Sequence, residues 1–340
     1  MRRDTFFVRL AALCAFLAIA ATAAVAQTPD SGMRIVMVTF RGCEEACMGF
    51  QDYVEGSGMG AEVMILDIAQ DKELIPAMRN EVRRLAPDLL VTWGTSVTRG
   101  MIGTVDDADP ELVSGIPTVF MIVADPVGAE IVKSREDPGR SYVTGTVNRV
   151  PEEIQMRVLA EYRPFDRIGV IYNDDELNSV LKAEEIHRVG QEQRFEVVDR
   201  VLQNGPDGSP LVEDIASAVA DLAAKDIDFL YLGSSSFLLS NADILTGAAL
   251  DEGVALATAY EAMVRNSDAL IALANAYYNV GQLAGRQAER ILVEGVTPGD
   301  LEVVGLDRFT VLINIDTAAK LDLYPPMLLL RYAEIIGGPG

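Results

Sequence analysis

Short apolar runs alternate along this chain with longer segments in which apolar residues recur every three or four positions. The run at 33–40 is apolar and rich in β-branched residues, which is typical of a buried strand. The segment 72–85 carries apolar residues at positions 74, 75, 78, 82 and 85, the spacing of one helix face. Repeated alternation of strand and helix predicts an α/β protein whose parallel sheets are covered by helices on both faces.

The alternation occurs in two sets. The first predicts strands at 33–40, 62–68, 88–93, 116–123 and 142–145, and helices at 45–55 and 72–85. It also predicts a short helix that follows the third strand and ends at about 102, and a helix that begins at Val127. The second predicts helices at 151–161, 176–190 and 210–225, and strands at 167–172, 195–202, 228–232 and 269–273. A helix at 277–293 and a strand at 309–313 follow, and the apolar segment 323–340 is expected to pack over one lobe and then fray. Two sets predict two doubly wound lobes joined near 148–151.

The N-terminus has the pattern of a secretory signal. Arg2, Arg3 and Arg9 precede an apolar segment at 10–25, which ends in the small-residue sequence Ala-Val-Ala. We expect cleavage after Ala26 and a periplasmic protein. An uncleaved anchor is the weaker alternative, because the apolar segment is shorter than the roughly 20 residues that a spanning helix needs. A lipid anchor at Cys14 would leave almost no apolar segment in front of the modified residue.

The remaining chain is long and acidic. Without residues 1–26, the 340-residue chain still has room for two domains of about 150 residues each. The formal net charge of the whole chain is −23. Nucleic acids and anionic membranes both require clustered positive charge, so this balance argues against either as a partner.

Two cysteines remain after removal of the signal, in the sequence C-E-E-A-C. In an exported chain, this pair favours a disulfide between Cys43 and Cys47 over free thiols. A metal pair is the alternative, but the single histidine, His187, lies far along the sequence. The pair follows the first predicted strand.

Polar and aromatic residues recur where the predicted strands end. In open α/β sheets, ligands bind at the carboxyl ends of the strands. The candidate ligand-binding residues are Phe40, Trp93, Thr95, Ser96, Asp125, Thr144, Tyr172, Asn173, Ser234, Ser235, Tyr260, Glu261 and Tyr277. Each has a structural alternative: the acid and the hydroxyl residues are common helix caps, and the aromatic residues are common in cores. Asp125 in particular precedes a predicted helix, and the tryptophan is as compatible with a core as with a cleft.

The sequence contains no pattern of catalytic residues. His187 lies in a predicted helix among charged residues, and Phe237 stands where a G-x-S-x-G elbow would need its second glycine. Phosphate-binding loops, dinucleotide fingerprints and H-E-x-x-H are also missing from the sequence. We therefore expect a binding protein with neither cofactor nor metal.

Several short motifs carry a family resemblance. They are V-A-D-P-V-G-A at 123–129, V-T-G at 143–145, W-G-T-S at 93–96, I-Y-N-D-D-E-L-N-S at 171–179 and Y-Y-N-V-G at 277–281. Together they resemble the ABC-type substrate-binding proteins, a family that includes bacterial tryptophan and tyrosine receptors. The resemblance implies the type I periplasmic-binding fold, with two lobes around a ligand cleft. It also implies that residues 27–148 and about 276–306 form the first lobe, and 149–275 and about 307–340 the second.

The resemblance implies a small-molecule ligand, an ABC permease in the inner membrane as partner, and a monomer. A ligand-sensing input protein for a membrane histidine kinase is the alternative. The chain departs from the family pattern in two segments that follow predicted strands. Ser234, Ser235 and Ser236 stand where relatives carry Thr-Asp-Asn, and Asn275-Ala276 replaces Phe-Asp. Two acids expected to bind an ammonium group are thus missing, although Glu261 lies near where another acid is expected. We expect an amphipathic ligand, with aromatic amino acids among the candidates.

Overall fold

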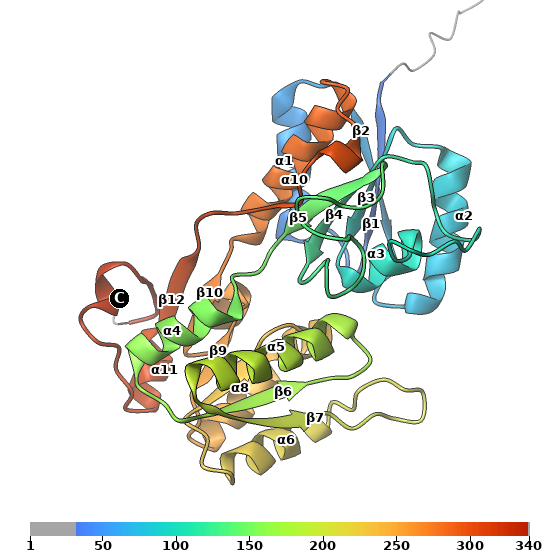
Figure 1. Ribbon diagram of the computed structural model, residues 1–340. Coiled ribbons are helices and arrows are strands. Elements are labelled where there is room, and N and C mark those ends of the chain that lie inside the picture. The colour runs from blue at the N-terminus through green and yellow to red at the C-terminus, as the bar shows by residue number, and fades with distance from the viewer. Residues whose placement is uncertain (1–31, 339–340) are drawn as a thin grey trace, which may run out of the picture. The chain divides into compact units, whose positions relative to one another are not determined.

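The computed structural model describes residues 32–338 (Figure 1). The predicted signal and its cleavage site lie outside the described residues. All of the helices and strands belong to one compact unit that begins at Met33. The described residues include no helix that is both long and apolar enough to cross a membrane.

The first sheet has the strand order β11-β5-β4-β3-β1-β2, and all neighbouring strands are parallel. Its strands are β1 (Arg34–Thr39), β2 (Glu62–Asp67), β3 (Leu89–Trp93), β4 (Thr118–Val123), β5 (Val143–Val147) and β11 (Val304–Gly305). Strands β3, β4 and β5 are buried along their whole length. Continuous apolar strands are expected here, because helices cover both faces of a parallel sheet.

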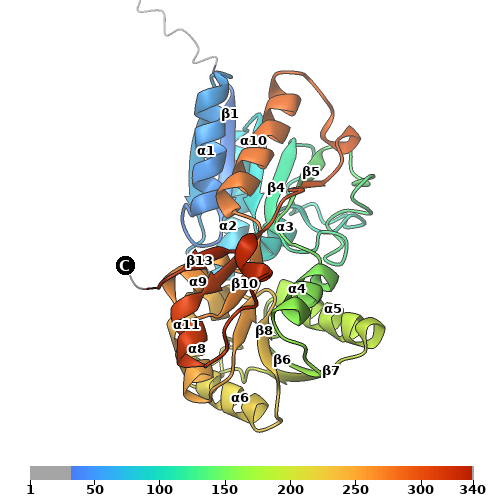
Figure 2. The ribbon, with the colours of Figure 1, turned by 90° about the vertical axis from the view of Figure 1, so that its left-hand side faces the viewer.

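Four helices belong to this first sheet. They are α1 (Glu45–Ser57), α2 (Ile75–Leu85), α3 (Thr95–Ile102) and α10 (Tyr277–Leu292). Helices α1 and α10 lie side by side although they are far apart in the sequence (Figures 1 and 2). Glycines allow this close approach: a Cβ at Gly49 would lie 2.0 Å from the carbonyl oxygen of Tyr278, and one at Gly281 only 1.9 Å from that of Ala46.

The second sheet has the order β13-β12-β10-β9-β8-β6-β7. Its strands are β6 (Arg167–Tyr172), β7 (Glu196–Val201), β8 (Phe229–Leu232), β9 (Leu256–Thr258), β10 (Ile271–Ala274), β12 (Thr310–Asn314) and β13 (Glu334–Ile336). Its helices are α4 (Glu152–Tyr162), α5 (Leu177–Gln193), α6 (Asp214–Ala223), α7 (Ser236–Ser240), α8 (Ala242–Asp251), α9 (Glu261–Asn266) and α11 (Ile315–Lys320). Short 3₁₀ turns occur at Lys72–Leu74, Pro298–Asp300 and Leu329–Arg331. The predicted fold class, two doubly wound α/β sheets, is confirmed.

Within the described residues the chain passes between the two sheets three times, at 148–151, 275–276 and 306–309. The last passage explains a difference from the expected parallel sheet. Strand β12 is antiparallel to β10, and its first residue, Thr310, pairs with Ala274, the last residue of β10. Because the chain leaves and re-enters the second sheet at the same edge, the returning strand must run in the opposite direction.

One local prediction was wrong. No helix starts at Val127, because residues 126–133 form successive turns in which Glu130 has a left-handed φ of 55°. Both Ile131 and Val132 donate to the carbonyl of Pro126 there, instead of continuing a helical ladder. The C-terminal segment packs over the second lobe as expected, with Leu329 buried in its core, and it also adds β13 to the second sheet next to β12.

Candidate ligand-binding site

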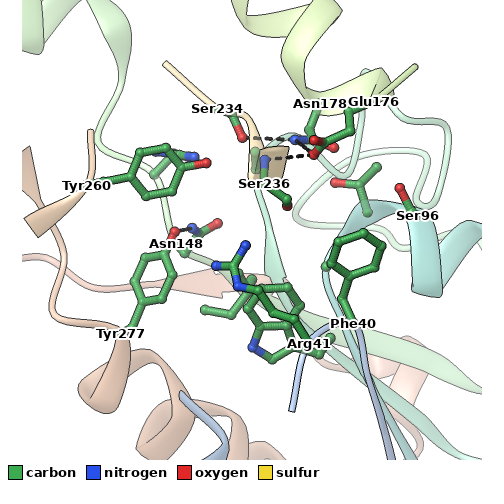
Figure 3. Close-up of a pocket in the computed structure, with 16 residues that line it drawn as sticks. Phe40, Arg41, Ser96, Asn148, Glu176, Asn178, Ser234, Ser236, Tyr260 and Tyr277 are labelled. Carbon is green, nitrogen blue, oxygen red and sulfur yellow. Dashed lines mark hydrogen bonds between the residues drawn. The ribbon is translucent and has the colours of Figure 1, made fainter. Parts of the chain in front are cut away.

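One pocket is lined by residues at the carboxyl ends of strands from both sheets (Figure 3). It contains about 420 Å³ of space free of protein atoms, part of which is open to solvent. The first sheet contributes Phe40, Arg41, Trp93, Thr95 and Ser96; the second contributes Glu176, Asn178, Ser234, Ser236 and Tyr260. Asn148 and Arg149, on the first passage between the sheets, and Tyr277, at the start of α10, complete the polar and aromatic lining.

An aromatic pair lies at the ends of β1 and β3. The rings of Phe40 and Trp93 are stacked, with centroids 6.5 Å apart and an interplanar angle of 5°. Trp93 is only 3% exposed and belongs to the core of the first sheet, yet it also lines the pocket. Its indole Nε1 is buried and has no hydrogen-bond partner among the described residues. The tryptophan is therefore a core residue and a pocket residue at once.

Arg41 extends into the pocket from the end of β1 (Figure 3). Its guanidinium carbon lies 5.1 Å from the centroid of the Trp93 ring, and its Nε donates to Glu44 Oε1 at 2.6 Å. Burial alone would lower the pKa of Arg41, but the hydrogen bond and charge of Glu44 raise it above its ordinary value. Its Nη1 is buried without a partner in the described part of the chain.

The disulfide between Cys43 and Cys47 is formed, with the two Cα atoms 5.1 Å apart. It encloses Glu44, which is the residue immediately before α1 and the partner of Arg41. The expected disulfide is thus present next to the pocket, and it fixes the segment that holds Arg41 in place.

Arg149 is the second guanidinium in the pocket. Its guanidinium carbon lies 4.6 Å from the centroid of the Tyr260 ring, and its Nη1 donates to the carbonyl of Ala259 at 3.3 Å. Its Nε is buried and has no partner within residues 32–338. Unlike Arg41, it makes no ion pair with an acid of the described chain.

The carboxylate of Glu176 lies against the N-terminus of α7 (Figure 3). Its Oε1 accepts hydrogen bonds from Asn173 Nδ2 at 3.1 Å and from the Phe237 amide at 2.9 Å. Its Oε2 accepts from Asn178 Nδ2 at 3.3 Å and from the Ser236 amide at 2.9 Å. Glu176 is only 4% exposed, so these four donors replace the water that a carboxylate needs.

Two tyrosines, Tyr260 and Tyr277, line the pocket and make hydrogen bonds to neighbouring residues. The hydroxyl of Tyr277 accepts from Asn148 Nδ2 at 3.1 Å, and burial raises its pKa to about 12. The hydroxyl of Tyr260 accepts from the Ser235 amide at 2.8 Å. The Tyr277 phenol is therefore neutral at physiological pH, and its proton remains available to a ligand. Asn148 Oδ1 is buried and has no partner among the described residues.

A second hollow adjoins the pocket and shares Arg41, Tyr260 and Tyr277 with it. It holds about 720 Å³ of space free of atoms, part of it open, and three acids line it: Glu44, Glu45 and Glu261. Burial, followed by the charge of Glu261, raises the pKa of Glu45. The two openings therefore differ in charge, because this one contains acids that the first pocket does not.

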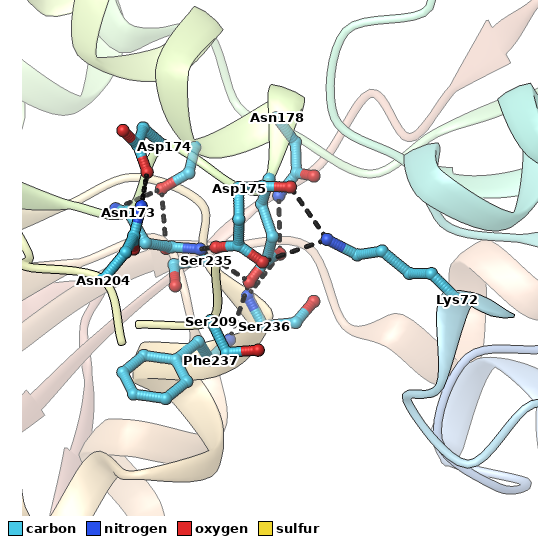
Figure 4. A network of polar contacts seen from close by, with 12 residues as sticks. Lys72, Asn173, Asp174, Asp175, Asn178, Asn204, Ser209, Ser235, Ser236 and Phe237 are labelled. Carbon is cyan, nitrogen blue, oxygen red and sulfur yellow. Dashed lines mark hydrogen bonds and ion pairs between the residues drawn. The ribbon is translucent and has the colours of Figure 1, made fainter. Parts of the chain in front are cut away.

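An ion pair connects the two sheets beside the pocket (Figure 4). Lys72, just before α2, donates from Nζ to the Asp175 side chain at 3.0 Å and to the Asp175 carbonyl at 2.8 Å. Asp175 immediately precedes Glu176. The contact therefore joins the first sheet to the loop that holds the buried carboxylate.

The structure brings together seven of the residues predicted from strand ends. They are Phe40, Trp93, Thr95, Ser96, Ser234, Tyr260 and Tyr277. The other six do not line this pocket. Asp125 accepts from the Gly128 amide and so caps a turn, whereas the alternative had expected it to cap a helix. Thr144 donates to the carbonyl of Leu301 from inside β5, and Tyr172 packs partly buried against the core of the second sheet.

The remaining three predicted residues lie close to the site without lining the first pocket. Asn173 supports Glu176, and Ser235 caps α7 by accepting from the Leu238 amide. Glu261 pairs with Arg265 at 2.5 Å and lines the second hollow. Whether any of the predicted residues contacts ligand remains a prediction.

Sequence reasoning missed the three charged residues of the pocket and its two asparagines. Arg41, Asn148, Arg149, Glu176 and Asn178 were not among its candidates. One signal was available: residues 148–151 were expected to cross between lobes, and a crossing segment at the strand ends must pass the cleft. The positions of Glu176 and Asn178 within the motif at 171–179 offered a second.

No group of three or more His, Cys, Asp or Glu residues suited to a metal ion occurs in residues 32–338. His187 lies on α5 and shares a 2.9 Å hydrogen bond with Asp199 on β7. It is thus placed as expected for a residue on a helix surface.

Two α/β sheets, three passages between them and a pocket at their carboxyl ends define a two-lobed binding protein of the periplasmic type. The chain belongs to the family described as ABC transporter substrate binding protein, which matches residues 35–336. Proteins of this family bind substrates and are not enzymes. The predicted family is therefore confirmed.

Similar proteins point the same way. A tyrosine-binding protein from Clostridioides difficile is 31% identical over 209 residues, which cover 61% of this chain and 57% of that protein. The match thus spans less than two thirds of that relative. A Streptococcus pneumoniae ABC domain solved in complex with L-Trp has a TM-score of 0.78 at 20% identity, covering 90% of this chain and 100% of that one. A conserved domain protein from Vibrio cholerae has the same TM-score at 23% identity, covering 90% and 99%. The two structures establish a shared fold.

Proposed function

We propose that this protein is an extracytoplasmic solute-binding protein that delivers a small organic ligand to an ABC permease in the inner membrane. The observation that carries the proposal is the pocket lined by strand ends of both sheets and by the segments that pass between them. A ligand in that position contacts both halves at once, so its binding favours a closed arrangement. The protein supplies affinity and no covalent chemistry.

The ligand in this proposal is amphipathic. The stacked pair of Phe40 and Trp93, together with Tyr260 and Tyr277, offers aromatic surface to a planar or apolar body. Hydroxyl and amide groups nearby, including Thr95, offer hydrogen bonds to its polar end. The tyrosine-binding relative and the relative solved with L-Trp support a ligand with an aromatic ring.

Transfer in this mechanism follows opening and closing of the two lobes. We take the lobes to be 27–148 with about 276–306, and 149–275 with about 307–340. Three passages between them act as the hinge, and the Lys72–Asp175 contact stabilises the closed arrangement. Its two side chains are 37% and 26% exposed, so it contributes at most about 1 kcal/mol and can break readily on opening.

Mass spectrometry of small molecules that co-purify with the protein identifies a ligand. Adding this ligand back to stripped protein should raise the melting temperature, because a ligand at 100 times its Kd stabilises the folded state by about 2.7 kcal/mol. Small-angle scattering should show a smaller radius of gyration in the complex. A tight ligand that leaves the scattering curve unchanged contradicts closure.

Delivery and export are tested separately. Uptake of the labelled ligand should fall when cells lack the protein, and unchanged uptake contradicts delivery while leaving binding intact. If the protein is exported and cleaved as expected, the intact mass of the periplasmic protein should match a chain that begins at Gln27. A product that retains residues 1–26 contradicts the cleavage site.

A further inference from the structure

The pocket offers a ligand two guanidinium groups that are not fully hydrogen-bonded. Arg41 Nη1 and Arg149 Nε are both buried without a partner in the described residues. Buried N–H groups of this kind are costly unless something accepts from them. Arg41 forms an ion pair with Glu44, whereas Arg149 forms none with an acid of residues 32–338. The charge of Glu152 also acts on Arg149, but Glu152 pairs with Lys182 and does not line the pocket.

Glu176 is the one carboxylate among the residues that line the pocket, and it has no free lone pair. A carboxylate offers about four lone-pair sites, two on each oxygen. Each oxygen of Glu176 already accepts two hydrogen bonds, and two of the four donors are backbone amides of α7 that cannot turn away. An ammonium group entering the pocket would therefore have to displace existing bonds.

The neighbouring acids do not substitute for it. Glu44 pairs with Arg41 and faces the second hollow, and Glu261 pairs with Arg265 there. Asp125 caps a turn outside the pocket, and Asp175 pairs with Lys72. None of these four lines the pocket that holds the two arginines.

Two neutral groups of the lining complete the picture. Trp93 Nε1 is a buried donor without a partner, and Asn148 Oδ1 is a buried acceptor without one, among the described residues. Both side chains are only 3% exposed. The buried side-chain atoms of the lining that lack a partner in the described residues are thus charged and neutral donors and one amide acceptor, beside hydroxyls such as that of Thr95, which can donate or accept.

We propose, building on the function above, that the ligand is a planar organic carboxylate without an ammonium group. Its carboxylate accepts hydrogen bonds from Arg149 and Arg41, since the guanidinium fork matches a carboxylate. Its ring lies against the Phe40–Trp93 pair, and a hydroxyl or ring N–H of the ligand donates to Asn148 Oδ1. A zwitterionic amino acid of the same shape would place its ammonium among donors, with no charged acceptor.

Titration calorimetry with two matched sets of probes tests whether the pocket prefers a carboxylate without an ammonium group. The first set is 3-(4-hydroxyphenyl)propionate, L-tyrosine and tyramine, which share a ring and differ in the charged groups. The second is indole-3-propionate, L-tryptophan and tryptamine. In the set whose ring fits, the carboxylate should bind at least about tenfold more tightly than the amino acid, because an ammonium buried without an acceptor is unfavourable. The amine should show no binding.

The variant Arg149→Gln tests the assigned group. It should weaken binding of the acid by about 10- to 100-fold, the range for loss of a hydrogen bond to a charged group. The exposed Arg163→Gln is the matched control and should bind as the parent does. The ligand-free melting temperature of each variant shows whether a loss of binding comes from unfolding.

The outcomes separate this inference from the proposed function. An amino acid that binds as tightly as its matched acid, or an Arg149→Gln protein that is folded and binds the acid normally, overturns the inference and leaves a solute receptor. Failure of both acids to bind also overturns it. The proposed function fails instead when extracts of the purified protein contain no small molecule whose return raises the melting temperature.

Discussion

Replacement of Glu176 by glutamine is the sharpest test of how the site is held together. The substitution keeps the shape of the side chain but turns one acceptor oxygen into an NH2 donor. If the new amide replaces Oε1, the Phe237 amide and Asn173 lose their acceptor; if it replaces Oε2, the Ser236 amide and Asn178 lose theirs. Either orientation therefore leaves one backbone N–H of α7 facing a donor.

The size of the effect follows from these four bonds. A buried backbone donor without a partner costs about 1 to 3 kcal/mol, and the asparagine can turn to find another acceptor. The two bonds that survive lose their charge assistance, about 1 kcal/mol each. We therefore expect Glu176→Gln to lower the free energy of unfolding by about 3 to 5 kcal/mol, a large share of the 5 to 15 kcal/mol typical of a domain.

Urea unfolding at neutral pH, followed by circular dichroism, measures this loss. The control is Glu55→Gln, because Glu55 is exposed on α1 and should change stability by less than about 0.5 kcal/mol. A loss below about 1 kcal/mol for Glu176→Gln would refute the account of a saturated carboxylate. It would mean that the four donors find water or other acceptors in its place.

Three further predictions concern the surroundings of the site. Replacing Cys43 and Cys47 by serine should lower the free energy of unfolding by about 2 kcal/mol, the loop-entropy value for so short a loop, and a urea midpoint unaffected by reductant would contradict it. Gly281→Ala places a Cβ 1.9 Å from a carbonyl oxygen of α1 and should cost about 3 kcal/mol in thermal unfolding, whereas Gly56→Ala, with nothing within 4 Å, should be neutral or stabilising. Lys72→Ala should weaken ligand affinity by up to about fivefold in low-salt calorimetry, an effect that should shrink as salt rises; equal affinities at low salt would count against a closing contact.

The fold could be predicted because buried parallel strands give continuous apolar runs. β1, β3 and β4 each coincide with such a run within a residue or two. Short elements at the sheet edges could not be found this way. Strand β11 has two residues and β13 has three, too few to show any period. The direction of β12 depends on where the chain re-enters the sheet, which local sequence does not encode.

The sequence predicts where in the fold the candidate site lies more readily than it predicts which residues line it. A strand end is visible in the sequence, but a shift of two residues changes which side chain reaches the pocket. The predicted strand at 142–145 ends two residues before β5 does, so Thr144 was proposed where Asn148 lines the pocket. Glu176 escaped notice for another reason: its role depends on amides of α7, sixty residues later in the chain.

The pairing of α1 with α10 bears on how the chain is made. Helix α1 ends at Ser57, whereas α10, which packs against it, begins only at Tyr277. Strand β11, at the edge of the same sheet, ends later still, at Gly305. On a ribosome that adds roughly 5 to 20 residues per second, the face of α1 that contains Gly49 and Phe50 would wait for its partner for more than about ten seconds. The first sheet is thus begun first and completed almost last, and a nascent chain stopped anywhere before α10 exposes an apolar helix face. Under the export proposed above, this delay favours translocation, because an N-terminal half that cannot finish folding stays unfolded enough to pass through a translocation channel.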